Sequence, residues 1–253
     1  MKKYLIIALL MVLGMAYPSY ARWSVGAAGG GVAAAPAGET CTGSLIVIAH
    51  FENSDTITTG TPAGCSATGD TTWDLATGYG DSAYVADPAT GSGSYSLNLP
   101  TDASSEDRAV LGMTSIDGAQ MRVDFFMKIS ALPATGDRDI IVIGYDDDNI
   151  YRLQLTTDGE ITASHRGGGY ARTLTTTDCD MTTATWYHIV SAYREGTSDP
   201  SMYVTCGVTT ASTNDNLYSQ SGVDPVNVTV GYGGNYAFDG MVDYLKVYNT
   251  YSD

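Results

Sequence analysis

The sequence has 253 residues, of which 43% are hydrophobic and 16% are charged, and its 12 Lys and Arg face 28 Asp and Glu, for a formal net charge of -16. This composition predicts a globular chain with one substantial core rather than a disordered one, because aromatic residues reach 10% and apolar runs recur throughout. It also argues against nucleic acid or an anionic membrane surface as a partner, since the basic residues are scattered singly among the acids.

The first 21 residues have the parts of a secretory signal peptide. The chain starts with Met-Lys-Lys, continues with an uncharged apolar stretch over residues 4–15, and places the small residues Ser19 and Ala21 before a cleavage point. The apolar stretch is shorter than the roughly 20 residues that a membrane-spanning helix needs. We therefore expect residues 1–21 to be removed and the mature chain to be secreted, periplasmic or displayed at the cell surface, without inserting into the membrane.

Residues 22–40 consist mainly of Gly and Ala with a single Pro, and they contain little that could pack into a core. This composition predicts a flexible linker. A single domain over residues 41–253 is expected to follow, because the pattern changes there to short apolar or alternating runs.

Four cysteines stand at Cys41, Cys65, Cys179 and Cys206, with no Cys-x-x-Cys pair and no His at a metal-ligand spacing. This argues against zinc. In an exported chain an even number of cysteines favours disulfides, and four cysteines allow three pairings. The distances along the sequence favour Cys41 with Cys65 and Cys179 with Cys206, and the alternative is that the thiols are buried and reduced.

Short β-branched and aromatic runs separated by Gly, Asp, Asn, Ser and Thr predict strands, and none of these runs has convincing helical periodicity. The predicted strands are Leu45–Phe51, Tyr95–Leu99, Gln120–Ile129, Asp139–Tyr145, Ile150–Leu155, Glu160–His165, Trp186–Tyr193, Ser201–Cys206, Val226–Val230 and Met241–Tyr248. Tight turns are expected at Asp146–Asn149 and Thr157–Gly159. Ten or more short strands without alternating helices predict an all-β fold, an antiparallel two-sheet sandwich or jelly roll.

Several of these runs also match a family pattern in their order and spacing. Residues 121–129 (MRVDFFMKI) form an alternating aromatic-rich strand, residues 186–190 (WYHIV) are similar to "WhHva", and residues 202–207 follow as "lyvnG". Residues 238–249 are close to "f.G.iDdvriyn". From about Leu45 to Tyr248 the chain thus resembles the concanavalin A-like lectin/glucanase superfamily, and within it the laminin-G-like (LamG, pentraxin-related) jelly rolls. This resemblance implies a concanavalin A-like jelly roll for the domain.

The catalytic patterns of that superfamily are incomplete here. Its glucanases carry Glu-x-Asp-x-x-Glu, which supplies a nucleophile and a general acid, and no such spacing occurs in this chain. Tyr244–Tyr248 resembles the last strand of alginate lyases, but the companion Arg-x-Glu-Leu and Gln-Ile-His motifs are missing. There is no Gly-x-Ser-x-Gly elbow, and the three histidines, His50, His165 and His188, are isolated. The sequence therefore predicts a protein without enzymatic activity.

A structural calcium ion is implied by the resemblance. Asp243 would contribute its side chain, and backbone carbonyls near Asn53 and Gly93 would complete the shell. Asp243 stands within an apolar strand, where an unpaired carboxylate would be costly to bury. The alternative is that this carboxylate accepts hydrogen bonds from nearby backbone N–H groups. The acidic run Asp146–Asp148 lacks the Gly and Glu of an EF-hand loop and is expected to be a solvated turn.

Carbohydrate binding is expected on the outward face of a sheet and at its rim. Alternation places Tyr151, Leu153 and Leu155 on one face and Arg152 and Gln154 on the other, which should face solvent. The residues expected to contact a ligand are Tyr145, Arg152, Arg166, Tyr170, Tyr232 and Tyr236. The sequence predicts an exported recognition module that binds a glycan, a cell surface or a protein surface in adhesion. A structural component of a cell-surface or virion appendage and a polysaccharide-active enzyme, glucanase-like or alginate-lyase-like, are the alternatives.

Overall fold

The computed structural model describes residues 44–49, 51, 74–75, 83–89, 94–99, 108–112, 118–146, 149–196, 200–217, 227–231 and 238–251. These residues form fifteen strands and no helix, so the described part of the chain holds no helix that could cross a membrane. The predicted signal peptide and linker, and the predicted pair of Cys41 with Cys65, lie outside the described residues.

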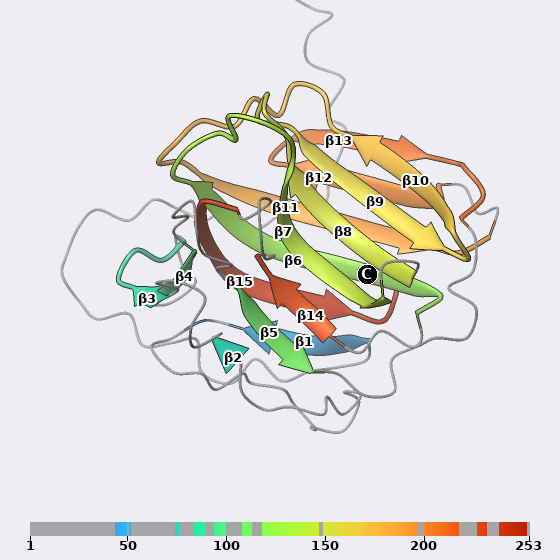
Figure 1. Cartoon of the computed structure of the whole chain (residues 1–253), viewed down its shortest axis with the longest axis horizontal. Helices are drawn as coiled ribbons and strands as arrows, with labels where there is room; N and C mark the ends of the chain where they lie inside the picture. Colours follow the sequence, from blue (N-terminus) through green and yellow to red (C-terminus); the bar gives the residue numbers. More distant parts are fainter. Residues whose placement is uncertain are drawn as a thin grey trace, which may run out of the picture. The chain divides into compact units, whose positions relative to one another are not determined.

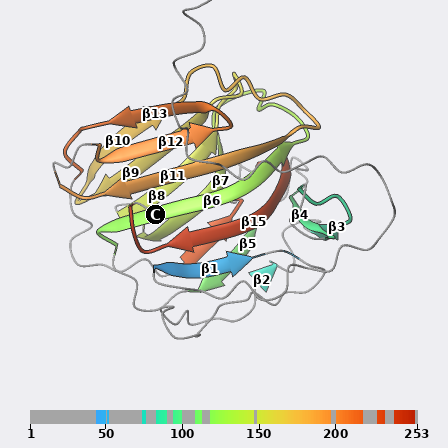
Figure 2. The same ribbon diagram turned by 180° about the vertical axis from the view of Figure 1, so that it is seen from behind.

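One sheet contains eight of the described strands, in the order β13–β12–β11–β6–β15–β4–β3, with β1 also paired to β15 (Figure 2). The bounds of these strands are β1 Leu45–Ala49, β3 Ala83–Val85, β4 Ser96–Leu99, β6 Gln120–Ile129, β11 Trp186–Arg194, β12 Met202–Cys206, β13 Thr209–Thr213 and β15 Gly240–Tyr248. All of these pairings are antiparallel.

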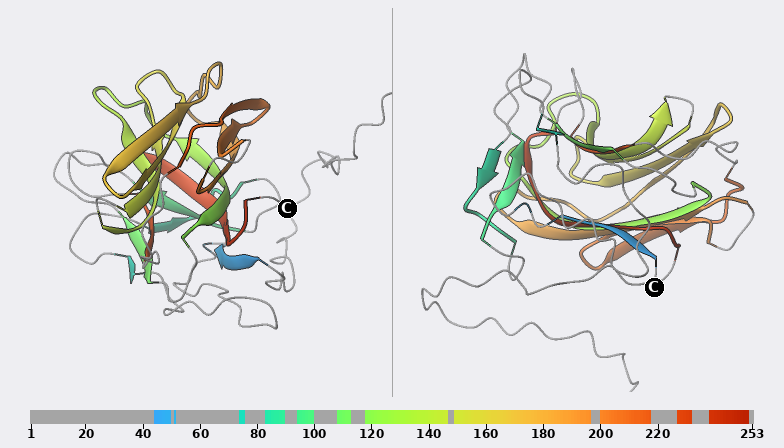
Figure 3. Two further views of the ribbon diagram at one scale, coloured as in Figure 1. Left: turned by 90° about the vertical axis from the view of Figure 1, so that its right-hand side faces the viewer. Right: turned by 90° about the horizontal axis from the view of Figure 1, so that it is seen from below.

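The other sheet contains seven of the described strands in the order β10–β9–β8–β7–β14–β5–β2, also antiparallel (Figure 1). The bounds are β2 Asp74–Leu75, β5 Ala109–Gly112, β7 Arg138–Asp146, β8 Asn149–Leu155, β9 Ile161–Gly167, β10 Tyr170–Thr175 and β14 Asn227–Val230. The two sheets stack face to face, as the right-hand view of Figure 3 shows. The predicted antiparallel jelly-roll sandwich is therefore confirmed.

The core lies between the sheets and follows from the alternation of the strands. In β6, Val123, Phe125 and Met127 are fully buried, whereas Asp124 and Phe126 on the opposite face are partly exposed. Successive side chains of a strand point to opposite faces, so each strand gives one row of apolar side chains to the shared core. The burial of these rows is the main force that holds the two sheets together.

A disulfide and a buried hydrogen bond also join the two sheets. The disulfide between Cys179 and Cys206 links the segment after β10 to the end of β12, which confirms that predicted pair. The backbone N–H of Cys179 also donates to the carboxylate of Glu160. Inside the core, the hydroxyl groups of Tyr151 in β8 and Ser191 in β11 are hydrogen-bonded.

Two glycines of the predicted turn and closing motifs are required by geometry. Gly159 closes the turn between β8 and β9 with a φ of +81°, and a Cβ there would lie 2.9 Å from the backbone nitrogen of Met181. At Gly240, which begins β15, a Cβ would lie 2.3 Å from the carbonyl oxygen of Lys128. Both positions therefore exclude a side chain, the first also because its backbone is left-handed.

A polar groove on the seven-stranded sheet

The outward face of β8 carries one of the predicted ligand residues, Arg152. Tyr151, Leu153 and Leu155 are buried in the core, at 0%, 0% and 1% exposure, whereas Arg152 and Gln154 are partly exposed on the opposite face. This alternation confirms the predicted faces of the strand. It makes the row on β8 that includes Arg152 and Gln154 available to a ligand.

The register with the neighbouring strands extends this row sideways. Arg166 in β9 lies opposite Ile150, and Ser164 lies opposite Arg152. On the other side of β9, Ala171 in β10 lies opposite Arg166. Residues that face each other across an antiparallel pair share one side of the sheet, so polar side chains of two strands and the start of a third form one surface.

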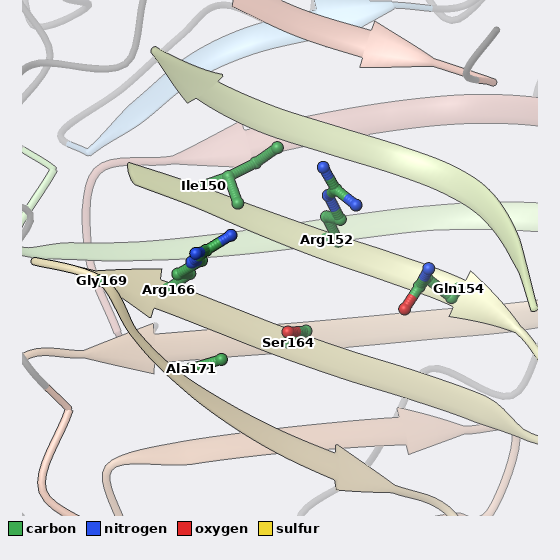
Figure 4. Close-up of a pocket in the computed structure, with 7 residues that line it drawn as sticks. All are labelled: Ile150, Arg152, Gln154, Ser164, Arg166, Gly169 and Ala171. Carbon is green, nitrogen blue, oxygen red and sulfur yellow. The ribbon is translucent and has the colours of Figure 1, made fainter. Parts of the chain in front are cut away.

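This surface is hollowed into an open groove of about 500 Å³. Figure 4 shows the residues that line it: Ile150, Arg152, Gln154, Ser164, Arg166, Gly169 and Ala171. The side chains of Arg152 and Arg166 come from neighbouring strands and stand on the same side of the sheet. The volume is within the range of about 300–1,000 Å³ that is usual for small-molecule sites.

The turn from β9 to β10 forms one end of the groove. Gly168 and Gly169 have φ values of +55° and +81°, and they reverse the chain between Gly167 and Tyr170, which are paired. Gly168 and Gly169 thus form the hairpin turn between β9 and β10. It leaves Gly169 and Ala171 at the rim.

Asp139 in β7 lies at the other end, opposite Gln154. Its side chain is 2% exposed. Burial raises the pKa of the Asp139 carboxyl group, and the attraction of Arg152 and a hydrogen bond with the Gln154 side chain only partly oppose this effect. The buried acid therefore lies on the groove side of the sheet and interacts there with Arg152 and Gln154.

The sheet behind the groove is rigidly packed. His165 precedes Arg166 in β9 and Tyr151 precedes Arg152 in β8, and both rings are buried in the core. They lie 4.5 Å and 4.7 Å, respectively, from the ring of Tyr193 in the opposite sheet. Burial lowers the pKa of His165 to about 4, so this imidazole is neutral at physiological pH and acts as part of the core.

The predicted ligand residues are distributed unevenly around the groove. Arg152 and Arg166 line it together. Tyr170 stands between two lining residues and is 58% exposed, but its own side chain is not part of the lining. Tyr145 belongs to β7, where only its backbone is described, and Tyr232 and Tyr236 lie outside the described residues.

Ser164 was not among the predicted ligand residues. The signal that points to it is the two-residue alternation of β9, which places Ser164 on the same face as Arg166. The pairing of β8 with β9 was needed to set both beside Arg152.

The predicted metal residue Asp243 is fully buried in β15, at 0% exposure. One carboxylate oxygen accepts the backbone N–H of Ala89 at 2.8 Å, and the other accepts the N–H of Tyr244 at 2.7 Å. Tyr244 has a φ of +50°, and the pairing of β15 with β6 shifts register between Asp243 and Lys246. The alternative arrangement, in which backbone donors compensate the carboxylate, is therefore present.

Because backbone N–H groups already compensate the Asp243 carboxylate, its burial does not by itself call for a calcium ion. The proposal of calcium at Asp243 rests on the family resemblance. Among the described residues, no three His, Cys, Asp or Glu side chains cluster in a way that could hold a metal ion. The remaining ligands would have to be backbone carbonyls, as predicted near Asn53 and Gly93, and both of those residues lie outside the described part of the chain.

The outward face of the eight-stranded sheet holds the third histidine. The Nε2 of His188 in β11 lies 2.6 Å from a carboxylate oxygen of Asp124 in β6, and the other oxygen of Asp124 is 3.2 Å from Arg122. The His188 ring stacks on Phe126 at 4.8 Å. His188 is thus held by its neighbours on that sheet, on the side of the sandwich away from the groove.

Comparison with solved structures identifies proteins of similar fold. The binding domain of botulinum neurotoxin DC, solved in complex with rat synaptotagmin II, matches with a TM-score of 0.58 at 8% identity, over 83% of this chain and 49% of that one. The binding domain of botulinum neurotoxin serotype C1 gives 0.54 at 10% identity over the same shares. A Trypanosoma rangeli sialidase in complex with the inhibitor DANA gives 0.48 at 14% identity, over 63% of this chain.

The chain spans about a quarter of the sialidase, 26%, and about half of each toxin chain. At these identities the likeness concerns the fold alone. No curated protein matches the sequence. The family model described as the concanavalin A-like lectin/glucanases superfamily matches residues 102–251, more than half of the chain, and this protein therefore belongs to that superfamily.

Proposed function

We propose that this protein is an exported, non-catalytic recognition module that binds carbohydrate through the groove on β8, β9 and β10. The observation that carries the proposal is the convergence of Arg152, Gln154, Ser164 and Arg166 on one open hollow of about 500 Å³. Guanidinium, amide and hydroxyl groups are the side chains that hydrogen-bond sugar hydroxyl groups. Because the groove is open and lies on a packed sheet, it can present these polar groups to a ligand in fixed positions.

The fold agrees with this role. In one protein of similar fold, botulinum neurotoxin type C, cell entry is dependent upon interaction with two ganglioside molecules. Superfamily membership covers both lectins and glucanases, and fold alone does not determine function. The proposal therefore rests on the groove of this chain.

A variant that fills the groove tests the proposal. Ser164 is partly exposed in the middle of the lining, and Ser164→Trp would place a large ring there whatever the charge of the ligand. Ser212→Trp is the matched control, because Ser212 is an exposed residue of β13 in the other sheet. The full chain, with both variants, is applied to a glycan array, and equal melting temperatures confirm that all three are folded.

The expected result is that the wild type and Ser212→Trp bind the same glycans and that Ser164→Trp loses them. The bound glycan is then incubated with the wild type, and no reducing ends or unsaturated products should accumulate. Binding that survives Ser164→Trp would contradict the proposed site. Turnover of the glycan would instead favour the polysaccharide-active alternative, and the absence of any glycan ligand would favour a structural component of a surface or virion appendage.

A further inference from the structure

We infer that the groove selects sugars that carry an anionic group, a carboxylate or a sulfate ester, and that Arg152 and Arg166 hold this group together. The inference rests on the proposed function, because it concerns the ligand of the same groove. The shared chemistry is that of an oxyanion on a sugar ring, with hydroxyl groups beside it for Gln154 and Ser164.

The charge of the groove differs from that of the protein. The sequence has a formal charge of -16, yet the two charged residues among the seven that line the groove are both arginines. A chain with more than twice as many acids as bases would place acids on an arbitrary patch of surface. The lining is therefore more positively charged than the average surface of this protein, which favours an anionic ligand.

The register sets the spacing of the two arginines. Ile150 is opposite Arg166 and Ser164 is opposite Arg152, so the arginines are diagonal neighbours on β8 and β9. Diagonal neighbours have Cα atoms about 7–8 Å apart, within reach of one another for long side chains. One oxyanion can therefore contact both guanidinium groups, whose forked donors match the geometry of a carboxylate or sulfate.

The neighbouring acid does not cancel this charge. Asp139 lies opposite Gln154 on the groove side of the sheet and attracts Arg152, but it is 2% exposed and is not part of the lining, so a single buried acid stands beside two arginines. Ser164 and Gln154 flank Arg152 on the same face. These neutral side chains would hydrogen-bond the ring hydroxyl groups, which separates recognition of the sugar from recognition of its charge.

Two pairs of polymers that differ only in charge test the inference with the full chain. Polygalacturonate is compared with its methyl ester, and dextran sulfate with dextran. The variants are Arg152→Gln and Arg166→Gln. The control is Arg172→Gln, because Arg172 lies opposite the core residue His165 and hence on the other face of β10, so this change removes the same charge outside the groove.

We expect at least one acidic polymer to bind ten times or more tightly than its neutral counterpart, and the pair that shows this effect distinguishes carboxylate from sulfate. Each groove variant should weaken this binding by about tenfold to a hundredfold, as expected for loss of hydrogen bonds to a charged group. Arg172→Gln should change it less than threefold. Raising the salt concentration should weaken wild-type binding more than that of the groove variants.

Equal binding of acidic and neutral polymers would overturn the inference, as would equal effects of Arg172→Gln and the groove variants. If neutral glycans bind and Ser164→Trp abolishes their binding while the arginine variants do not, the inference fails and the proposed function stands. If no polymer or arrayed glycan binds in a way that Ser164→Trp removes, both fail.

Discussion

The hydroxyl group of Tyr151 donates a hydrogen bond to the Oγ of Ser191 across the interior of the sandwich. The direction follows from the second bond of Ser191, whose hydroxyl donates to the backbone carbonyl of Tyr203 at 2.8 Å, so that Tyr151 supplies the remaining proton. Tyr151 is fully buried, and burial raises its pKa. Because Tyr151 precedes Arg152 in β8, this bond ties the strand that bears the groove to the opposite sheet.

Tyr151→Phe should lower the free energy of unfolding by about 1–2 kcal/mol, because it removes a buried hydrogen bond and leaves Ser191 with an unused acceptor. The double variant with Ser191→Ala should lose less than the sum of the two single changes, since both remove the same bond. Urea denaturation measures all three. Additive losses would show that the two hydroxyl groups are not coupled, and glycan binding at the groove should be unchanged in Tyr151→Phe.

Most of the fold was predictable because strand alternation is a local signal. All ten predicted strands are present, with ends that differ by at most two residues, as for Glu160–His165 against β9, Ile161–Gly167. The unpredicted strands are short, as in β2 and β3, or lie at sheet edges. In β10 and β13 Thr is frequent and most side chains are exposed or partly exposed, so the apolar alternation that identifies a half-buried strand is absent.

The site was predictable only in part, because it depends on pairing between strands. The outward direction of Arg152 follows from β8 alone, but its position beside Arg166 needs the register of β8 on β9. Four of the six residues expected to contact a ligand are tyrosines, yet the described lining contains no aromatic side chain. Composition shows how many tyrosines a chain has, whereas only the fold determines which of them face a ligand.

Removal of the disulfide by the double variant Cys179→Ser and Cys206→Ser should destabilise the protein by about 3–4 kcal/mol, as expected for a cross-link that closes a loop of this length. The two cysteines are 27 residues apart in the sequence. Guanidinium denaturation of the variant and of the wild type, both in the presence of reductant, should give similar midpoints. Peptide mapping without reductant should recover the link between Cys179 and Cys206, and it also tests the predicted pair of Cys41 with Cys65.

His165 should make stability depend on pH below neutrality. Its pKa is about 4 in the folded protein against 6.5 for an ordinary histidine, so the unfolded chain takes up the proton first as the pH falls. The stability that depends on a neutral His165 is fully present above about pH 6.5 and is lost as the pH falls from about 6.5 to 4. The total loss in the free energy of unfolding is about 3 kcal/mol, of which about 2 kcal/mol is lost by pH 5.

His165→Phe separates this effect from the titration of carboxyl groups. The free energy of unfolding of the wild type should fall more between pH 7 and pH 5 than that of His165→Phe, by about 2 kcal/mol. Chemical denaturation at the two pH values measures the difference. Parallel pH profiles of the two proteins would show that His165 is not held neutral by burial.

Asp243→Asn should destabilise the protein even without calcium. The amide oxygen of Asn can replace one carboxylate oxygen, but its NH₂ group cannot accept a hydrogen bond, so the N–H of either Ala89 or Tyr244 loses its acceptor. Loss of a buried acceptor costs about 1–3 kcal/mol. A lower melting temperature in this variant is therefore no measure of calcium binding, and the response to added calcium is the informative quantity.

We propose, from the family resemblance, that calcium at Asp243 stabilises the fold. A ligand that binds only the folded state at a hundred times its dissociation constant adds about 2.7 kcal/mol, so the wild type should melt lower in EDTA and recover when calcium is added. Asp243→Asn should start from a lower melting temperature and gain little from calcium. A wild type that is indifferent to EDTA would show that the carboxylate serves the backbone donors alone. An equal gain in both proteins would place the ion elsewhere, with the Asp146–Asp148 segment as the next candidate, and Asp147→Asn would then test that position.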